Sequence, residues 1–533
     1  MTPHKLIRAS IPFALGITLT ILFWLALIPK ETATAIHPDV SPASIQRSTT
    51  SPPADLTWIN LLKTLHATKD APDLTLSLNL NLNTQHLAGH TPLGSSITIS
   101  VTREGALIAN ALTTPVPDLP GFFYETYLEW IGYTYGLQPG DLIWLHQAGS
   151  VVTMTVPTLN SQASSPNDTL SGLGPANASL LAYLLPYADP TASYTQTTTT
   201  EADGTYQFDW GNSPGVAPAD RGFVAYTPAP NQSVYSLFVA PLLRAQLNGQ
   251  EISGYATPYA SVYLTVRDTN GELLSSGTAY TYDDGHFSTI DYERFSEATI
   301  QPGYKIFADV EGQTFSMTAQ ALTIALDAQN SEITGETSPN SPVQVIRFDG
   351  PLDENPYSEF WILPPDEIHA GTANASGEFT FPVSLQPGNY GAVAVTGADD
   401  FITFVRFNMP FIRVFQREPY DYRLTFITGQ VNQFNTPIEI AIQGPSGYLK
   451  DIFSVETQPN GFFVGGEVEN NDLSISTGDV ITVSTENGVE TSMHVPTFTV
   501  ETDAEADTVS GQAPPDSQLT ISLSDYWYDD NGG

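Results

Sequence analysis

The chain has 533 residues, with 57 acidic against 18 basic side chains, a formal charge of −39 and no cysteine. This charge excludes a nucleic-acid partner, because phosphate binding requires a basic surface. The lack of cysteine excludes disulfides, thiolate metal sites and a cysteine nucleophile. Hydrophobic residues make up 41% of the chain, which is enough for packed cores, and the length indicates about three or four domains.

The first 35 residues have the pattern of an export segment. Lys5 and Arg8 precede an apolar run at residues 11–28, and Ala33 and Ala35 form a small-x-small cleavage motif. The pattern predicts a signal peptide cleaved after Ala35, although the run is also long enough to remain as a membrane anchor. In both cases the rest of the chain is expected to be extracytoplasmic, and only residues 11–28, if uncleaved, would contact a membrane.

Residues 36–70 follow as a Ser/Thr/Pro-rich linker. Such a composition is typical of an extended tether that buries little apolar surface. The first folded unit is therefore expected after residue 70.

An internal repeat organises the remainder of the chain. Six glycines, spaced 81–94 residues apart, each precede a short polar turn and an alternating apolar strand. These repeat glycines are Gly89, Gly172, Gly254, Gly335, Gly429 and Gly511. In the first copy the apolar positions are Ile97, Ile99 and Val101. Period-two alternation predicts a strand with one buried face and one solvated face.

Each of the first five copies contains a second landmark, a glycine followed two positions later by an aromatic residue. The pairs are Gly121 with Phe123, Gly204 with Tyr206, Gly285 with Phe287, Gly377 with Phe379, and Gly461 with Phe463. Asp-Gly and Asn-Gly pairs at several of these sites predict hairpin turns with positive φ at the glycine. A third landmark, a Pro-Gly or Gly-Asp turn, occurs at 139–141, 302–303, 387–388 and 478–479, with Gly222 as a weaker match.

Units of about 82 residues with closely spaced turn signals predict an all-β chain, a tandem array of seven-stranded β-sandwiches. The sequences ITGETSPNSPVQVIRF, DDGHF and QPGYKIFADV resemble the immunoglobulin-like repeats of bacterial surface and secreted proteins. The carboxypeptidase regulatory-like sandwich is a second resemblance, because it shares the glycine and the Asp-Gly-x-aromatic turn. The predicted borders are 71–160, 161–244, 245–325, 326–417 and 418–502, followed by a partial sixth repeat at 503–533.

Each repeat is expected to bury a hydrophobic interior of its own. Cross-linking by Lys–Asn isopeptide bonds is not expected, because Lys63, Lys69, Lys305 and Lys450 recur at no equivalent repeat position. The sixth copy stops 22 residues after Gly511, so the chain is expected to be a fragment or truncated reading frame. Any C-terminal anchor or catalytic module would then lie beyond residue 533.

Acidic residues gather where one repeat follows another, and the oxygen ligands of Ca²⁺ come from such side chains. The candidate ligands are Asp327, Glu332, Asp503, Glu505 and Asp507. The alternative is a solvated acidic linker that keeps the protein soluble. Calcium is the one cofactor that the sequence suggests.

The fourth repeat departs from the common spacing, because 42 residues separate Gly335 from Gly377 where other copies have 31 or 32. Insertions in repeat arrays fall in loops and often carry binding residues. The candidate ligand-binding residues are Asp353, Glu354, Tyr357, Phe360, Trp361, Asp366 and Glu367. They combine flat aromatic rings with hydrogen-bonding acids, as surfaces that bind sugars or proteins do. Residues 360–363 also fit a buried strand.

No metalloprotease, serine-hydrolase, P-loop or dinucleotide motif occurs, so no catalytic residue is predicted. The expected function is that of a cell-surface or secreted stalk or adhesin that presents a binding surface to a cell-envelope, glycan or protein ligand. One alternative is an accessory region of a secreted polysaccharide-acting enzyme with its catalytic module beyond residue 533. Another is carbohydrate binding by the fourth repeat.

Overall fold

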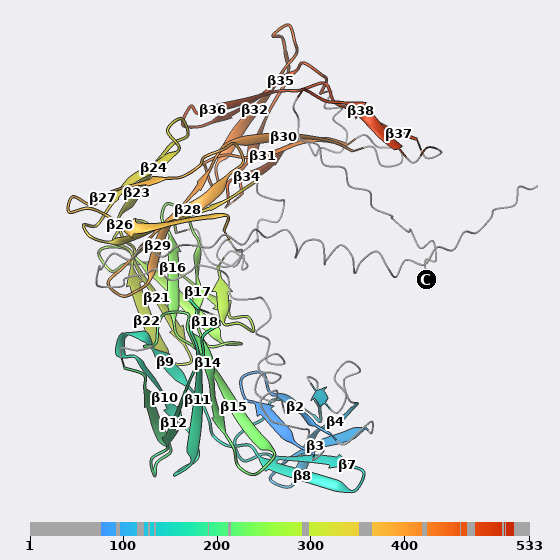
Figure 1. Cartoon of the computed structure of the whole chain (residues 1–533), viewed down its shortest axis with the longest axis vertical. Helices are drawn as coiled ribbons and strands as arrows, with labels where there is room; N and C mark the ends of the chain where they lie inside the picture. The colour runs from blue at the N-terminus through green and yellow to red at the C-terminus, as the bar shows by residue number, and fades with distance from the viewer. Residues whose placement is uncertain are drawn as a thin grey trace, which may run out of the picture. The chain divides into compact units, whose positions relative to one another are not determined.

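The computed structural model describes most of the chain after residue 75 (Figure 1). The described residues are 76–91, 96–114, 122–125, 128–132, 135–189, 191–211, 215–289, 298–350, 365–417, 424–458, 460–465, 475–503, 506 and 508–515. The predicted export segment and linker, and most of the sixth repeat, lie outside this part. Within it, no helix is long and apolar enough to cross a membrane, and the run at 11–28 lies outside it.

The described chain is all-β, with one short 3₁₀ turn at Ser165–Asn167. Strands group into seven per repeat, as predicted, apart from a short additional strand in the first repeat. The apolar positions expected to face inward do so: Ile97, Ile99 and Val101 are fully buried. The fold class predicted from the alternating pattern is therefore confirmed.

The first two repeats share a seven-stranded sheet. Its order is β12-β11-β14-β15-β1-β2-β5. The bounds are β1 (Leu78–Asn81), β2 (His86–His90), β5 (Phe122–Glu125), β11 (Ser179–Leu185), β12 (Tyr194–Thr199), β14 (Arg221–Tyr226) and β15 (Gln232–Val239). Strand β1 of the first repeat and β15 of the second run parallel at the centre of this sheet.

Each of these repeats also has a second sheet of its own. In the first repeat the order is β6-β4-β3-β7-β8, with β3 (Ile97–Arg103), β4 (Ala106–Thr113), β6 (Glu129–Trp130), β7 (Leu142–Gln147) and β8 (Ser150–Thr155). In the second repeat the order is β13-β10-β9, with β9 (Gln162–Ser164), β10 (Thr169–Leu173) and β13 (Thr205–Asp209).

The third and fourth repeats are joined in the same way. Their shared sheet has the order β20-β17-β16-β29-β28-β25-β26. The bounds are β16 (Leu242–Gln246), β17 (Ile252–Tyr255), β20 (His286–Ser288), β25 (Pro342–Phe348), β26 (Glu367–Thr372), β28 (Tyr390–Thr396) and β29 (Ile402–Asn408). Here β16 and β29 form the central parallel pair.

The separate sheet of the third repeat has the order β19-β18-β21-β22, with β18 (Ser261–Arg267), β19 (Leu273–Tyr280), β21 (Lys305–Val310) and β22 (Gln313–Thr318). That of the fourth repeat is β23-β24-β27, with β23 (Leu322–Asp327), β24 (Glu332–Thr337) and β27 (Glu378–Pro382).

The fifth repeat has two sheets in its described part. They are β30-β31-β34, with β30 (Phe411–Arg417), β31 (Leu424–Gln430) and β34 (Phe462–Gly465), and β33-β32-β35-β36, with β32 (Pro437–Gln443), β33 (Leu449–Glu456), β35 (Val480–Thr485) and β36 (Glu490–His494). The hairpin of β37 (Thr499–Asp503) and β38 (Thr508–Gln512) opens the sixth repeat.

Two expectations about the repeats need correction. The interiors of the first and second repeats merge into one apolar cluster, and so do those of the third and fourth, because each pair shares a sheet. Strands β16, β23, β30 and β37 pair with the repeat that follows, although the predicted borders place most or all of each in the preceding one. In these four copies the strand before the repeat glycine belongs to the same hairpin as that glycine, and the borders left it out. The borders as limits of folding units stay a prediction.

Every repeat glycine in the first five copies lies directly opposite the aromatic residue of the second landmark. The pairs are Gly89 with Phe123, Gly172 with Tyr206, Gly254 with Phe287, Gly335 with Phe379, and Gly429 with Phe463. A Cβ at any of these glycines would clash with both the aromatic ring and a carbonyl of the adjacent strand. The glycine therefore leaves the space that the ring occupies.

The predicted turn chemistry is confirmed at Gly204, Gly285, Gly377 and Gly461, where φ is 83–90°. Gly222, in contrast, was wrongly matched to a turn. It lies within β14 opposite Phe238, and its missing side chain makes room for that ring. The positive φ near this point belongs to Ala219.

We expect Gly254→Ala to lower the free energy of unfolding by on the order of 1–3 kcal/mol, because the new methyl must displace Phe287 or part strands β16 and β17. Calorimetric melting of the full chain measures the effect. The matched control is Thr278→Ala on exposed β19, for which a change within about 0.5 kcal/mol is expected. Equal melting curves for the two variants would contradict the steric role of the glycine.

Candidate functional site

The insertion of the fourth repeat leaves β25 and returns into β26. Of its candidate ligand-binding residues, Asp353, Glu354, Tyr357, Phe360 and Trp361 lie outside the described residues. Asp366 and Glu367 are described, and they stand where the chain joins β26. The structure therefore describes the two ends of the insertion, next to β25 and β26.

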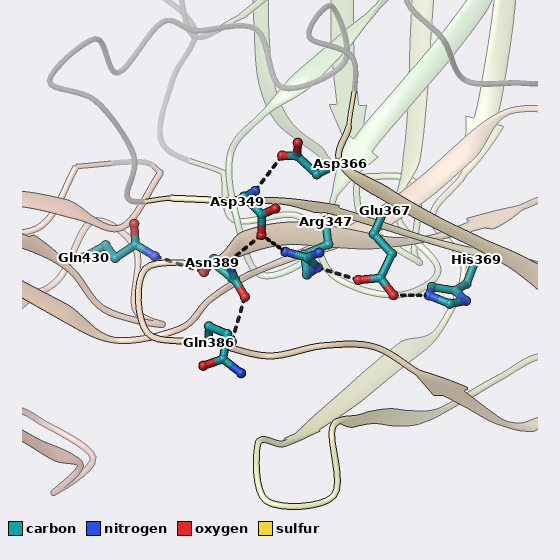
Figure 2. Close-up of polar contacts among 8 residues, drawn as sticks. All are labelled: Arg347, Asp349, Asp366, Glu367, His369, Gln386, Asn389 and Gln430. Carbon is teal, nitrogen blue, oxygen red and sulfur yellow. Dashed lines mark hydrogen bonds and ion pairs between the residues drawn. The ribbon is translucent and has the colours of Figure 1, made fainter. Parts of the chain in front are cut away.

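Arg347 holds the two ends of the insertion together (Figure 2). It lies directly opposite Glu367 in the antiparallel pairing of β25 and β26, and its Nε donates to Glu367 Oε2 at 2.6 Å. Its Nη1 forms an ion pair with Asp349, two residues farther along the chain. The Arg347 side chain is 9% exposed, so this cation is largely removed from water between two carboxylates.

Two further contacts extend the cluster. His369 Nε2 lies 2.6 Å from the second carboxylate oxygen of Glu367. The backbone N–H of Asp349 donates to Asp366 Oδ2 at 2.7 Å, which closes the insertion from the other side. Three carboxylates, one guanidinium and one imidazole thus meet at the ends of β25 and β26 (Figure 2).

Asn389 connects this cluster to the fifth repeat. Its Nδ2 donates to Asp349 Oδ1 at 3.2 Å, and its Oδ1 accepts the backbone N–H of Gln386 at 2.6 Å. Gln430, at the end of β31, donates from Nε2 to the carbonyls of Asn389 at 3.0 Å and Met409 at 2.9 Å. The fully buried Gln430 amide therefore satisfies two carbonyls of the preceding repeat.

The turn that contains Asn389 recurs, but with a different charge. In the first and fifth repeats the equivalent residues are Asp141 and Asp479, and both form ion pairs, with Arg103 Nε at 2.7 Å and with Lys450 Nζ at 2.6 Å. In the fourth repeat the neutral amide of Asn389 replaces the carboxylate. Arg347 of this repeat pairs instead with the residues at the base of the insertion.

Opposing influences act on the pKa of Glu367. Burial raises its pKa, but the hydrogen bonds from His369 and Arg347 together outweigh burial, and the resulting pKa lies below the usual value of 4.5. The Arg347 pKa is raised, because its bonds to Asp349 and Glu367 outweigh the effect of burial. A carboxylate kept ionised suits a structural clamp or a hydrogen-bond acceptor better than a proton donor.

A shallow groove lies over a different part of the fourth repeat. It has a volume of about 570 Å³ and runs across β23, β24 and β27. Gly335 and Phe379 line it, and Glu336, Asn374 and Glu378 are among its polar lining residues.

The proposed calcium ligands are only partly placed by the structure. Asp327 and Glu332 face each other across the β23–β24 hairpin, where Asp327 accepts the backbone N–H groups of Gln329 and Asn330, each at 3.0 Å. Asp503 is described, whereas Glu505 and Asp507 are outside the described residues. Among the described residues, no group of three or more acidic or histidine side chains is arranged to hold a metal ion. Calcium binding stays a prediction.

Five residues whose side chains join the polar cluster were not anticipated: Arg347, Asp349, His369, Asn389 and Gln430. Arg347 carried one usable signal, since a charged residue in a strand of apolar residues is rarely buried without a partner. The sequence could not identify that partner, because Asp349 and Glu367 lie on opposite sides of the insertion.

No protein-family model matches the chain, and no curated protein sequence matches it. One similar solved structure is a tetra-tandem repeat from the extending region of a large adhesion protein, with 14% identity, a TM-score of 0.13, and coverage of 65% of this chain and 94% of that one. Trypsin-activated alpha-2-macroglobulin from Escherichia coli gives 9% identity, a TM-score of 0.14, and coverage of 80% and 49%. A Salmonella alpha-2-macroglobulin mutant gives 10%, 0.13, and 81% and 40%.

This chain thus spans half or less of those two macroglobulin chains. TM-scores this low carry no argument about relationship or activity. The fold assignment rests on the strand order and pairing in the chain itself.

The lowered pKa of Glu367 predicts a pH dependence of stability. The ionised carboxylate stabilises the folded state above pH 4.5, and this contribution is lost as pH falls through the lower pKa of the folded state. We expect Glu367→Gln to remove this part of the acid-induced loss, so that melting temperature falls less steeply below pH 4.5 than in the wild type. Glu490→Gln on exposed β36 is the control. If melting temperature falls equally steeply with pH in the wild type and both variants, the ionised Glu367 carboxylate does not stabilise the fold through Arg347 and His369.

For calcium, the measurement is calorimetric melting of the full chain in millimolar Ca²⁺ and in chelator. A ligand that binds only the folded state raises the melting temperature. We expect a higher melting temperature with Ca²⁺ than with chelator, and Mg²⁺ at the same ionic strength is the control. An unchanged melting temperature would remove calcium from the list of cofactors.

Proposed function

We propose that the chain is an exported structural repeat protein that holds a binding surface away from the cell envelope. The proposal assigns it a mechanical and adhesive role, with no reaction of its own. Its partners would be components of the cell envelope, glycans or other proteins, and it would act outside the cytoplasm, at the cell surface or after secretion.

The observation that carries the proposal is the parallel pairing at the centre of each shared sheet. Strand β1 is the first strand of its pair of repeats, and β15 is the last. Tension along the chain would pull β1 from its N-terminal end and β15 from its C-terminal end. Because the two strands are parallel, these pulls act in opposite directions along the strands and load their hydrogen bonds in shear. The bonds then resist together instead of opening one after another.

The second pair of repeats repeats this geometry with β16 and β29, aligned from Arg244 opposite Ile402 to Gln246 opposite Phe404. An ion pair between Arg406 on β29 and Glu251 reinforces the joint, and both side chains are buried. In the first pair, Asn83 Oδ1 accepts the backbone N–H of Leu237 at 2.7 Å, which ties β15 to the turn that follows β1. Two independent pairs with one arrangement favour a load-bearing role.

Export is supported by the N-terminal sequence, where a basic flank, an apolar run and a small-x-small motif precede the linker. The resemblance of the repeats to immunoglobulin-like domains of bacterial surface proteins agrees with this location. The charge of −39 would keep such a chain soluble and separate from polyanions.

Force spectroscopy on the full chain tests the proposal. Each shared sheet closes about 160 residues between its first and last strands. If a pair unfolds as one unit, each event should release about 53–58 nm of chain, less the folded end-to-end length. Single repeats of about 80 residues would release about half as much. Two long steps at high force are the expected result.

A control changes the direction of loading. Because the chain has no cysteine, Asn270→Cys and Ser376→Cys supply unique attachment points in exposed turns of the third and fourth repeats. Pulling from these points does not load β16 and β29 from their outer ends. The unfolding force should then be lower than when the same pair is pulled through the chain. Equal forces in both directions, or only short steps, would argue against a load-bearing role.

A further inference from the structure

Four tyrosines stand exposed on one part of the third repeat. They are Tyr259, Tyr263, Tyr280 and Tyr282, and each is 46–54% exposed. Tyr263 lies on β18, Tyr280 ends β19, and Tyr259 and Tyr282 lie in the segments just beyond the paired ends of these strands. Tyr255 of the same repeat is only 2% exposed, and the other exposed tyrosines of the described residues are Tyr135, Tyr194 and Tyr448, in other repeats.

The backbone register places Tyr263 and Tyr280 on the exposed face of this hairpin, and a backbone hydrogen bond joins Tyr259 to Tyr282 at its end. Ser261 pairs with Tyr280 and Tyr263 pairs with Thr278, and the backbone N–H of Tyr259 donates to the carbonyl of Tyr282 at 3.4 Å. The residues between them, Ala260, Val262, Ala279 and Thr281, are buried on the other face. Tyr259 is therefore beside Tyr282, and Tyr263 is diagonal to Tyr280, within reach of large side chains.

The other repeats show that the fold does not require tyrosine at these positions. The same backbone hydrogen bonds identify the counterparts in three other repeats, and none of those counterparts is aromatic. In the order of Tyr259, Tyr263, Tyr280 and Tyr282 they are Asn177, Leu181, Thr199 and Glu201 in the second repeat, Asn340, Gln344, Thr372 and Asn374 in the fourth, and Asn435, Glu439, Glu456 and Gln458 in the fifth.

Tyr259 also occupies a backbone conformation that suits a different residue. Its φ is +60°, and the counterparts Asn177, Asn340 and Asn435 have φ of 50–59°. Asparagine tolerates this left-handed region, whereas a bulky side chain there is strained. A strained residue that its relatives within the chain avoid points to a role for its side chain outside the fold.

The surroundings of the four rings are acidic and polar. Asp283 and Asp284 follow Tyr282 directly, and Asp309 on β21 pairs with Tyr263 across the strands. Burial, together with the charges of Asp283 and Asp284, raises the pKa of Tyr259 to about 12. The phenol is thus neutral at physiological pH and can both donate and accept a hydrogen bond. One ring is also fixed in place, since Tyr282 stacks on His286 at 6.4 Å.

We propose that this tyrosine face binds an uncharged oligosaccharide. The rings present flat apolar surfaces for the C–H faces of sugar rings, and the phenols and carboxylates accept hydrogen bonds from sugar hydroxyl groups. An anionic polysaccharide is disfavoured by the neighbouring aspartates and by the charge of the whole chain. The four exposed residues are spread along one hairpin, so an extended ligand fits better than a compact cation. This inference stands independently of the mechanical role.

The test is binding of the full chain to an array of neutral and anionic oligosaccharides, followed by titration of the best neutral ligand. The key variant replaces all four tyrosines with their counterparts from the fourth repeat: Tyr259→Asn, Tyr263→Gln, Tyr280→Thr and Tyr282→Asn. The same fold already carries these residues, so the variant should remain folded. We expect at least a tenfold loss of affinity, with a melting temperature that is unchanged or higher because the strain at residue 259 is relieved.

The control is Tyr448→Asn, which removes an exposed tyrosine from the fifth repeat and should leave binding unchanged. Binding should also persist in 0.5 M NaCl, since the ligand carries no charge. The proposal is overturned if no neutral glycan binds, if the fourfold variant binds as well as the wild type, or if only choline or basic peptides bind and salt abolishes that binding.

Discussion

The contact between a strand glycine and the aromatic ring opposite it is the interaction on which each repeat depends. Glycine within a strand costs about 0.5–1 kcal/mol relative to alanine, but here the space above its backbone is filled by a ring. The ring comes two residues after a turn glycine with positive φ, as Phe287 follows Gly285. One contact therefore fixes three things: the position of the turn, the register of the hairpin, and the packing of the ring against the first strand. Its recurrence in five repeats explains how sequences that differ elsewhere keep one fold.

The repeats contribute different strands to the shared sheets. The first and third repeats contribute three strands, which include the first strand of the repeat. The second and fourth repeats contribute four strands, which include the last strand of the repeat. Joining β1 to β15, and β16 to β29, merges these strands into one sheet and merges two small interiors into one larger one. A domain of about 80 residues has little apolar surface to bury alone, so sharing an interior compensates for the lack of disulfides. The buried pair of Arg406 and Glu251 belongs to this joint, and either charge alone would be costly there.

Local features of this fold could be predicted, because they depend on neighbours in sequence. The burial of Ile97, Ile99 and Val101 follows from alternation, and the positive φ at Gly204 and Gly285 follows from the Asp-Gly pairs. Gly222 was misjudged because a glycine under a ring and a glycine in a turn look alike in a sequence. The parallel pairing was invisible for a different reason: β16 and β29 are about 160 residues apart, and no local pattern encodes a partner at that distance. The clamp around Arg347 was missed for the same reason, since its partners are brought together only by the pairing of β25 with β26.

The turn at Tyr259 shows how a repeat can carry strain that the fold itself does not require. A left-handed residue other than glycine or asparagine costs on the order of 1–3 kcal/mol and persists only where the surroundings hold it. Thr281 provides that support, because its Oγ1 accepts the N–H of Ala260 at 2.7 Å and donates to the carbonyl of Thr257 at 2.7 Å. Thr200 makes the equivalent bonds in the second repeat, around a turn that contains unstrained Asn177. The hydrogen bonds of this threonine therefore belong to the fold that the repeats share, whereas the tyrosine at this turn is a feature of the third repeat. Because hydrogen bonds already fix this turn, the repeat can hold a residue whose backbone conformation is unfavourable and whose side chain serves another purpose. The second, fourth and fifth repeats have asparagine at this position, so the tyrosine changes the surface of the third repeat alone among these four.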